Sequence, residues 1–250
     1  MDADKSQEFS QTSLLSDEGI YRGNLMAPSM QSVCSDQEPG LTVVKGTLPP
    51  GVLMIQPFLS DAFCDELISK INAEQKFKAT IQDVKDVERN IESKTRNNEI
   101  SSLGSLSDDL ETLVNNFFKD EFINYYKKNI SSFEKPQALI YSKGGFYDYH
   151  ADSENWDKHQ KQWVKSANRD YSLLIYLNDD FDGGELTFPN FQMRLKPRKG
   201  MLLCFPSDHR YLHKAELTTQ GHRYVIVSWA RAKGTELIEN APLYDSIQVK

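Results

Sequence analysis

The second half of the chain is divided into short apolar segments, and this division limits the possible fold more than any other feature of the sequence. The segments cover residues 138–141, 171–178, 185–188, 192–195, 201–205 and 223–231, and Gly, Pro or Asn residues stand between them. Many short strands at close spacing, with few helical segments between them, are typical of a β-sandwich or barrel. We therefore predict a mainly β fold with flanking helices.

Two helices are predicted ahead of this β-rich part. The first begins at Ser60, a residue type that caps helix N-termini, and carries Leu67 and Ile71 on one apolar face. The second begins at Ser107 and continues to residue 128. Its apolar face is broad and consists of Leu110, Leu113, Val114, Phe117, Phe118, Phe122 and Tyr125. This spacing is that of a buried helix face, so we expect these side chains to pack on the sheet and not to hold a cofactor.

The composition predicts the domain organisation. Residues 1–41 are rich in Ser, Asp, Glu and Gln, and such a segment buries too little apolar surface to offset its ordering entropy. We expect 1–41 to be a flexible or loosely docked arm and 42–233 to be the functional domain. Within it, 42–136 would support a β-core at 137–231, and 234–250 would form a C-terminal tail.

Charge and cysteine content argue against several classes of protein. The net charge is −7, so there is no basic field to attract nucleic acid or an anionic membrane. Cys34, Cys64 and Cys204 are far apart and match neither a disulfide framework nor a zinc site. No apolar run approaches the ~18 residues of a membrane span, and the N-terminus lacks the apolar core of a secretory signal. We expect a cytoplasmic protein with no nucleic-acid or membrane partner.

The functional prediction depends on His150 and Asp152. Side chains two residues apart on a strand point the same way, so an imidazole and a carboxylate would project side by side. Non-haem Fe(II) oxygenases combine such a pair with a second histidine in a two-His-one-carboxylate triad. The candidates for that third ligand are His159, His209, His213 and His222.

A buried cation is predicted on the last apolar segment. Arg223 shares one strand face with Val225, Val227 and Trp229. A charge that points into an apolar interior has to be paired, and the guanidinium fork suits a carboxylate. From the spacing alone, a bound ligand and a structural ion pair are both consistent with this arginine.

Taken together, four stretches resemble the prolyl 4-hydroxylase-type branch of the 2-oxoglutarate- and Fe(II)-dependent dioxygenases. The first is the Tyr-x-x-Gly-x-x-Tyr-x-x-His-x-Asp pattern at 141–152. The second runs through 169–189 and includes a Gly-Gly-Glu triplet, and the third is 196–205. The fourth places His213 ten residues before Arg223, with Trp229 near the end of the last core strand. The resemblance covers about 137–231, and residues 52–71 also resemble the family's entering strand and helix.

The resemblance implies a double-stranded β-helix, or jelly-roll, with helices packed on one outer face. It implies that His150, Asp152 and His213 hold Fe(II). The spacing to Arg223 favours His213 over His209 as the third ligand.

The resemblance also implies how a co-substrate is held. Arg223 would bind the distal carboxylate of 2-oxoglutarate, Tyr176 would hydrogen-bond that same carboxylate, and Tyr141 would lie near the metal-bound end. The implied reaction is hydroxylation of a C–H bond, with O2 consumed, succinate and CO2 formed, and ascorbate as reductant. The expected substrate is a prolyl residue in a peptide or protein.

Several alternatives stay open. The enzyme could hydroxylate another side chain or a free small molecule, or the chain could be a β-barrel binding module without turnover. Residues 76–106 could form a partly stranded loop over the site, but a solvated surface is the favoured interpretation. Trp156 and Trp163 could share a helix face in a lid at 153–168, or could belong to ordinary packing. The sequence predicts no oligomeric state.

Overall fold

The computed structural model of the 250-residue chain describes residues 10–11, 19–22, 48–79, 81–83, 86–91, 94–239, 241–242 and 244–249. Most of the predicted N-terminal arm therefore lies outside the described residues. The two stretches of the arm that are described are short edge strands. The predicted domain boundaries stay a prediction.

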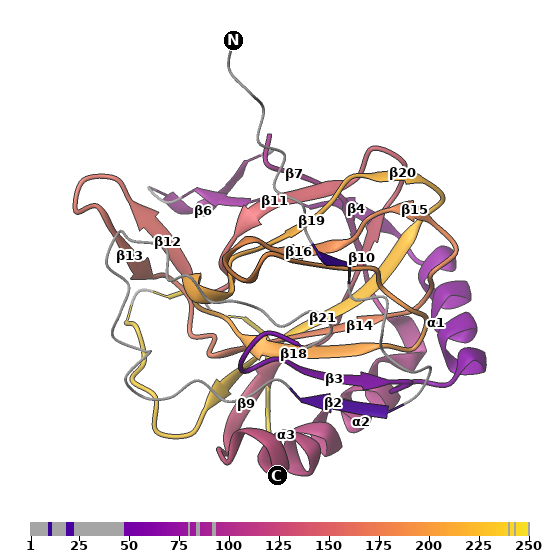
Figure 1. The fold of residues 1–250 in the computed structure, drawn as a ribbon, viewed down its shortest axis with the longest axis horizontal. Coiled ribbons are helices and arrows are strands. Elements are labelled where there is room, and N and C mark those ends of the chain that lie inside the picture. Colours follow the sequence, from indigo (N-terminus) through magenta and orange to yellow (C-terminus); the bar gives the residue numbers. More distant parts are fainter. Residues whose placement is uncertain are drawn as a thin grey trace.

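Two sheets facing each other form the core (Figure 1). The ten-stranded sheet has the order β2 (Gly19–Arg22), β3 (Leu53–Gln56), β18 (Leu202–Pro206), β14 (Tyr171–Tyr176), β21 (Arg223–Ala232), β10 (Gln137–Tyr141), β8 (Glu99–Ser101) and β4 (Lys76–Lys78), with β9 (Ile130–Glu134) beside β21 and β22 (Ser246–Gln248) beside β9. The six-stranded sheet has the order β1 (Ser10–Gln11), β17 (Met193–Leu195), β16 (Leu186–Phe188), β19 (His213–Ala215), β11 (Phe146–His150) and β7 (Arg96–Asn97). Its only parallel pair among the described strands is β1 with β17.

Three further strand pairs lie outside these sheets. They are β5 (Ile81–Asp83) with β6 (Asp86–Ile91), β12 (Glu154–Asp157) with β13 (Gln162–Lys165), and β15 (Asp182–Gly183) with β20 (Thr218–Gln220).

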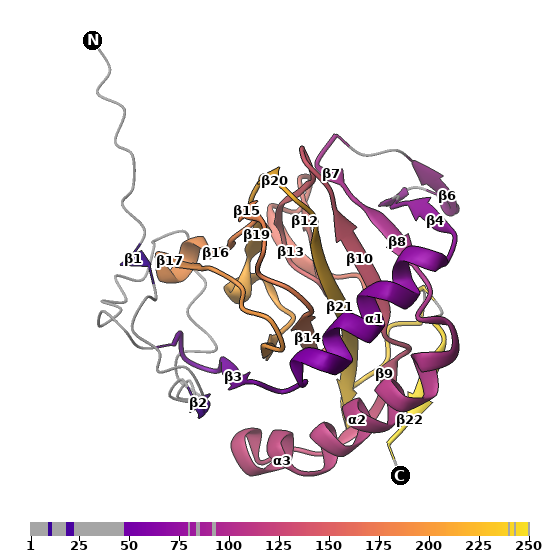
Figure 2. The ribbon, with the colours of Figure 1, turned by 90° about the vertical axis from the view of Figure 1, so that its right-hand side faces the viewer.

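The three helices α1 (Asp61–Ala73), α2 (Ser107–Lys119) and α3 (Glu121–Tyr126) cover the outer face of the larger sheet (Figure 2). Strand β21 shows how the sheet separates two apolar layers. Tyr224 and Ile226 pack toward the helices, whereas Val225 and Val227 pack into the space between the two sheets. The alternation that we predicted for the strand of Arg223 is therefore present, and it directs that arginine inward.

The predicted cap of the first helix is confirmed. The hydroxyl oxygen of Ser60 accepts a hydrogen bond from the main-chain N–H of Phe63 at 3.3 Å. We expect Ser60→Ala to lower the free energy of unfolding by about 1 kcal/mol, because one N–H of the first turn loses its acceptor. Urea unfolding followed by circular dichroism measures this change. Ser105→Ala is the matched control, because Ser105 is exposed and caps no helix.

The second predicted helix is interrupted. Asp120, with φ −111° and ψ −83°, separates α2 from α3. Both parts keep their aromatic side chains in the core, including Phe118 and Phe122. The break therefore leaves the prediction of a buried aromatic face intact and corrects only the length of the helix.

Three other segments differ from the favoured interpretations. Residues 76–106 are partly stranded, and β7 pairs with β11, so a plain solvated surface is wrong for this part. Trp156 and Trp163 lie opposite each other on the β12–β13 hairpin, not on one helix face. The tail, for which the sequence showed no strong pattern, adds β22 to β9. No helix within the described ranges is long and apolar enough to cross a membrane.

Candidate metal centre

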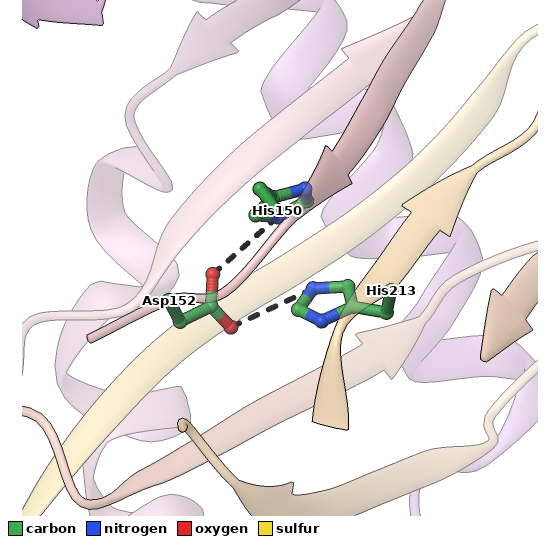
Figure 3. Close-up of side chains that lie close together, drawn as sticks. All are labelled: His150, Asp152 and His213. Carbon is green, nitrogen blue, oxygen red and sulfur yellow. Dashed lines mark ion pairs between the residues drawn. The ribbon is translucent and has the colours of Figure 1, made fainter. Parts of the chain in front are cut away.

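Three side chains from distant parts of the chain converge between the two sheets (Figure 3). His150 ends β11, Asp152 follows two residues later, and His213 begins β19. Nε2 of His150 lies 3.5 Å from Oδ1 of Asp152, and Nε2 of His213 lies 3.6 Å from Oδ2. One ligand atom from each residue lies within 4.8 Å of the others, which is close enough to share one ion. The structure thus brings together the three residues that the sequence predicted as ligands.

A bulge in β11 directs the site inward. Tyr147 pairs with Ala215, and His150 pairs with His213. Between these two pairs β11 advances by three residues while β19 advances by two, so β11 contains one extra residue. With regular alternation, Tyr147 and His150 would point to opposite faces. The extra residue instead puts both on the inner face, where their rings stack with centroids 3.6 Å apart.

The orientation of both imidazoles suits a metal. Nδ1 of His150 lies 2.8 Å from the main-chain oxygen of Asp148, and Nδ1 of His213 lies 3.0 Å from that of Tyr211. Because a carbonyl only accepts hydrogen bonds, each Nδ1 carries the proton and each Nε2 keeps its lone pair for an ion.

The protonation states suit the same purpose. Burial, together with the nearby His150, lowers the pKa of His213 to about 4, so its imidazole is neutral at pH 7. Burial alone would raise the pKa of Asp152, but His213, His150 and Ser172 outweigh it and hold the pKa well below its usual range. The neutral imidazole of His213, the carboxylate of Asp152 and the imidazole of His150 together form the donor set that Fe(II) takes in a facial triad.

Two serines hold Asp152 in place. The Ser172 hydroxyl donates to Oδ2 of Asp152 at 2.6 Å and lies 2.8 Å from the hydroxyl of Ser207. The main-chain N–H of Asp152 donates to the carbonyl of Ser207 at 3.1 Å. These contacts fix a residue that lies beyond the end of its strand, and the sequence analysis assigned neither serine to the site.

We expect Ser172→Ala to weaken divalent-metal affinity about tenfold, because partners behind metal ligands contribute roughly 10–100-fold to affinity. Titration with Mn(II), followed by electron paramagnetic resonance, measures the change. Ser131→Ala is a matched control, since it removes a serine hydrogen bond to the Arg231 carbonyl at 3.0 Å, away from the cluster. Equal affinity in wild type and Ser172→Ala would show that Ser172 does not support the ligand.

Arg223 points into the same space between the two sheets, and part of its hydrogen-bonding capacity is unused. Its side chain is 2% exposed. One amino nitrogen donates to the hydroxyl of Tyr176 at 3.3 Å, and the guanidinium lies 4.6 Å from the centre of the Tyr141 ring. Nε and the other amino nitrogen have no partner, and no described carboxylate forms an ion pair with this arginine. Buried donors without partners indicate a bound anion, so the structure favours a ligand over a structural ion pair.

A glycine gives Arg223 its space. A Cβ at Gly184 would lie 2.9 Å from the Phe181 ring and 3.2 Å from Cδ of Arg223, and the backbone there has φ +65°. Any other residue would be strained in this conformation and would crowd the arginine. The Gly-Gly-Glu triplet of the sequence therefore has a steric role beside the predicted co-substrate pocket.

The sequence analysis missed a stack on the ring of His150. Tyr147 covers the imidazole, and the Arg96 guanidinium lies 4.7 Å from the centre of the Tyr147 ring. Nε of Arg96 donates to Oδ1 of Asn98 at 2.6 Å. The sequence did contain a signal for Tyr147, because this residue belongs to the first family pattern. It contained no signal for Arg96, because nothing in the sequence indicated that β7 pairs with β11.

His209 does not take part in the cluster. Its ring stacks on Trp163 with centroids 5.4 Å apart, and its Nδ1 pairs with Glu154 on the β12–β13 hairpin. His159 is exposed, and His222 contacts Ser142. Among the histidines of the described chain, only His213 joins His150 and Asp152.

Comparison with known proteins agrees with this arrangement. Residues 136–231 match the family model described as the 2OG-Fe(II) oxygenase superfamily. Prolyl 3-hydroxylase 2 of Mus musculus is 38% identical over 66 residues, which are 24% of this chain and 9% of that protein. A putative prolyl 4-hydroxylase of Acanthamoeba polyphaga mimivirus is 29% identical over 110 residues, 40% of this chain and 46% of that protein.

A solved structure shows the same fold. A prolyl hydroxylase from Trichoplax adhaerens, in complex with a hypoxia inducible factor oxygen degradation domain peptide fragment, has a TM-score of 0.53 and 20% identity, covering 72% of this chain and 83% of that one. The predicted mainly β fold is confirmed. The match to the first curated relative spans less than a tenth of its length.

Proposed function

We propose that this chain, which belongs to the 2OG-Fe(II) oxygenase superfamily, hydroxylates a prolyl residue in a peptide or protein. The observation that carries the proposal is a pair of features in the space between the two sheets. His150, Asp152 and His213 form a three-donor cluster, and Arg223 is buried with unpartnered donors.

The residues present fit both groups that such an enzyme needs. His150, Asp152 and His213 would hold Fe(II), and their three donors leave coordination positions open for reactants. Arg223 and the Tyr176 hydroxyl would bind the distal carboxylate of 2-oxoglutarate through charge-assisted hydrogen bonds. When bound, Fe(II) with 2-oxoglutarate and O2 supplies the oxidation that converts C–H to C–OH and releases succinate and CO2.

The protein's own contribution is position and exclusion of water. Asp152 and His213 are nearly buried, with side chains 7% and 6% exposed. Tyr147 stacks on His150 and restricts the imidazole to one orientation. A fixed, dry site holds reactants in a productive geometry and protects reactive species from side reactions.

The names of similar proteins support a prolyl substrate. They include a prolyl 3-hydroxylase, a putative prolyl 4-hydroxylase and a prolyl hydroxylase in complex with a peptide fragment. The relatives differ in the ring carbon that they oxidise, so the position of the hydroxyl group has to be measured. Ascorbate as reductant and a cytoplasmic location belong to the same proposal.

The test is succinate formation from 2-oxoglutarate with a panel of proline-containing peptides, first with Fe(II) and then with a chelator. We expect one or more peptides to stimulate chelator-sensitive succinate formation and to gain the mass of one oxygen atom on proline. Matched peptides with alanine in place of proline should not respond. Stimulation by alanine peptides, with the oxygen on another residue, would contradict the prolyl substrate. Absence of 2-oxoglutarate turnover under every condition would favour the binding-module alternative.

A further inference from the structure

Arg169, one residue after Asn168 and shortly before β14, links the C-terminal tail to the metal centre. Its guanidinium carbon lies 3.7 Å from the centre of the Trp229 ring and 4.5 Å from the centre of the Tyr244 ring. Its Nε and one amino nitrogen donate to the two carboxylate oxygens of Glu134 at 2.6 and 2.7 Å. The other amino nitrogen donates to the main-chain oxygen of Asp152 at 3.4 Å.

The tail is anchored at the residues that surround this arginine. Ser246 of β22 lies opposite Glu134 of β9. The main-chain N–H of Ile238 donates to Oδ1 of Asn168 at 2.9 Å, and Nδ2 of Asn168 donates back to the Ile238 carbonyl at 3.4 Å. In the sequence, Tyr244 lies between the two anchored residues, Ile238 and Ser246. The chain is therefore fixed before and after the ring that packs against Arg169.

Asp152 depends on few contacts, so each of them matters for its position. It follows the end of β11 and is held by Ser207, Ser172 and Arg169. The contact from Arg169 is long, so it is maintained only while the guanidinium cannot move. Two aromatic rings and a bidentate carboxylate restrict it in that way.

We infer that Tyr244 is a positioning residue of the proposed iron site, acting through Arg169 on the segment that carries Asp152. The inference rests on the proposed function, since it concerns the same metal. Tyr244 lies outside residues 136–231, the range that matches the family model. Under the tail is a cavity of about 140 Å³, lined among others by Trp229, Arg231, Leu237 and Tyr244. The tail is therefore not tightly packed over its length, and its effect on the site should come from Tyr244 in particular.

The test is Mn(II) affinity of the full chain, measured by electron paramagnetic resonance without 2-oxoglutarate. We expect Tyr244→Ala to bind Mn(II) about tenfold more weakly, at the lower end of the range for groups behind metal ligands. Tyr244→Phe keeps the ring and should retain wild-type affinity. Leu237→Ala is the matched control, because Leu237 lines the same cavity and is 62% exposed.

Equal Mn(II) affinity in Tyr244→Ala and wild type would overturn the inference. An equal loss in Leu237→Ala would also overturn it, since the cause would then be general packing of the tail. If Tyr244→Ala does not fold, Arg169→Lys replaces it, because it keeps the charge but loses the planar fork, and the same loss is expected. A wild-type chain that binds Mn(II) but consumes no 2-oxoglutarate would overturn the proposed function. The Mn(II) affinities of wild type, Tyr244→Ala and Leu237→Ala would still test the role of Tyr244.

Discussion

His150→Ala is expected to reduce succinate formation more than about 100-fold, while the fold is retained. A lost ligand should cost more than the roughly 10–100-fold that is typical of a partner behind a ligand. The fold should survive because His150 is the last residue of β11 and is only half-buried, whereas Phe118 and Phe205 are fully buried in the core. Coupled detection of succinate gives the rate, and thermal unfolding monitored by circular dichroism gives the stability.

His159→Ala is the matched control for this experiment, since it removes an exposed imidazole from the hairpin turn. It should leave succinate formation unchanged. Substitution of Asp152 or His213 by alanine should reproduce the loss seen for His150. Full activity in any one of these three variants would show that the cluster is not the metal site.

Arg223→Met is expected to have opposite effects on co-substrate binding and on stability. The KM for 2-oxoglutarate should rise about 100-fold or more, because each hydrogen bond to a charged group contributes about 1.5–3 kcal/mol and every ~1.4 kcal/mol is a factor of ten. The free energy of unfolding without ligand should stay constant or increase by about 1–4 kcal/mol, because an unpaired buried cation is replaced by an apolar side chain of similar length.

Thermal unfolding with and without 2-oxoglutarate separates the two effects. In wild type the ligand should raise the unfolding temperature, since it binds the folded state alone, and in Arg223→Met this rise should disappear. Arg231→Met, on the same strand but half-exposed, is the matched control and should keep the rise. Clear destabilisation of ligand-free Arg223→Met would mean that this arginine stabilises the fold and does not serve a ligand.

Short apolar runs made the central sheet predictable. Strands β10, β14, β18 and β21 coincide closely with the predicted segments, because each is a continuous apolar run ended by a turn residue. Arg223 could be found for the same reason, since it opens such a run. The predicted ligands were found from the His-x-Asp spacing and from the family resemblance. Of the two interpretations of Arg223 that the sequence left open, the structure favours a bound ligand, because buried donors of this arginine lack partners.

Features that depend on contacts between distant segments could not be predicted. Ser172 and Ser207 are ordinary residues until the fold brings them to Asp152. The Trp156–Trp163 pair has helical spacing in the sequence, yet the hairpin turn between them makes them cross-strand neighbours. Strand β22 is short and polar, and it forms because β9 offers a free edge, which is a property of the folded sheet.

The bulge in β11 constrains how this site can change during evolution or engineering. Because one extra residue between Tyr147 and His150 sets which side chains face the space between the sheets, the number of residues there matters more than their identity. Deleting one residue would turn the histidine or the tyrosine outward and break up the stack beside the proposed metal site. Libraries that vary Asp148 and Tyr149 by substitution should therefore yield functional clones, whereas libraries with length variation in this segment should yield almost none.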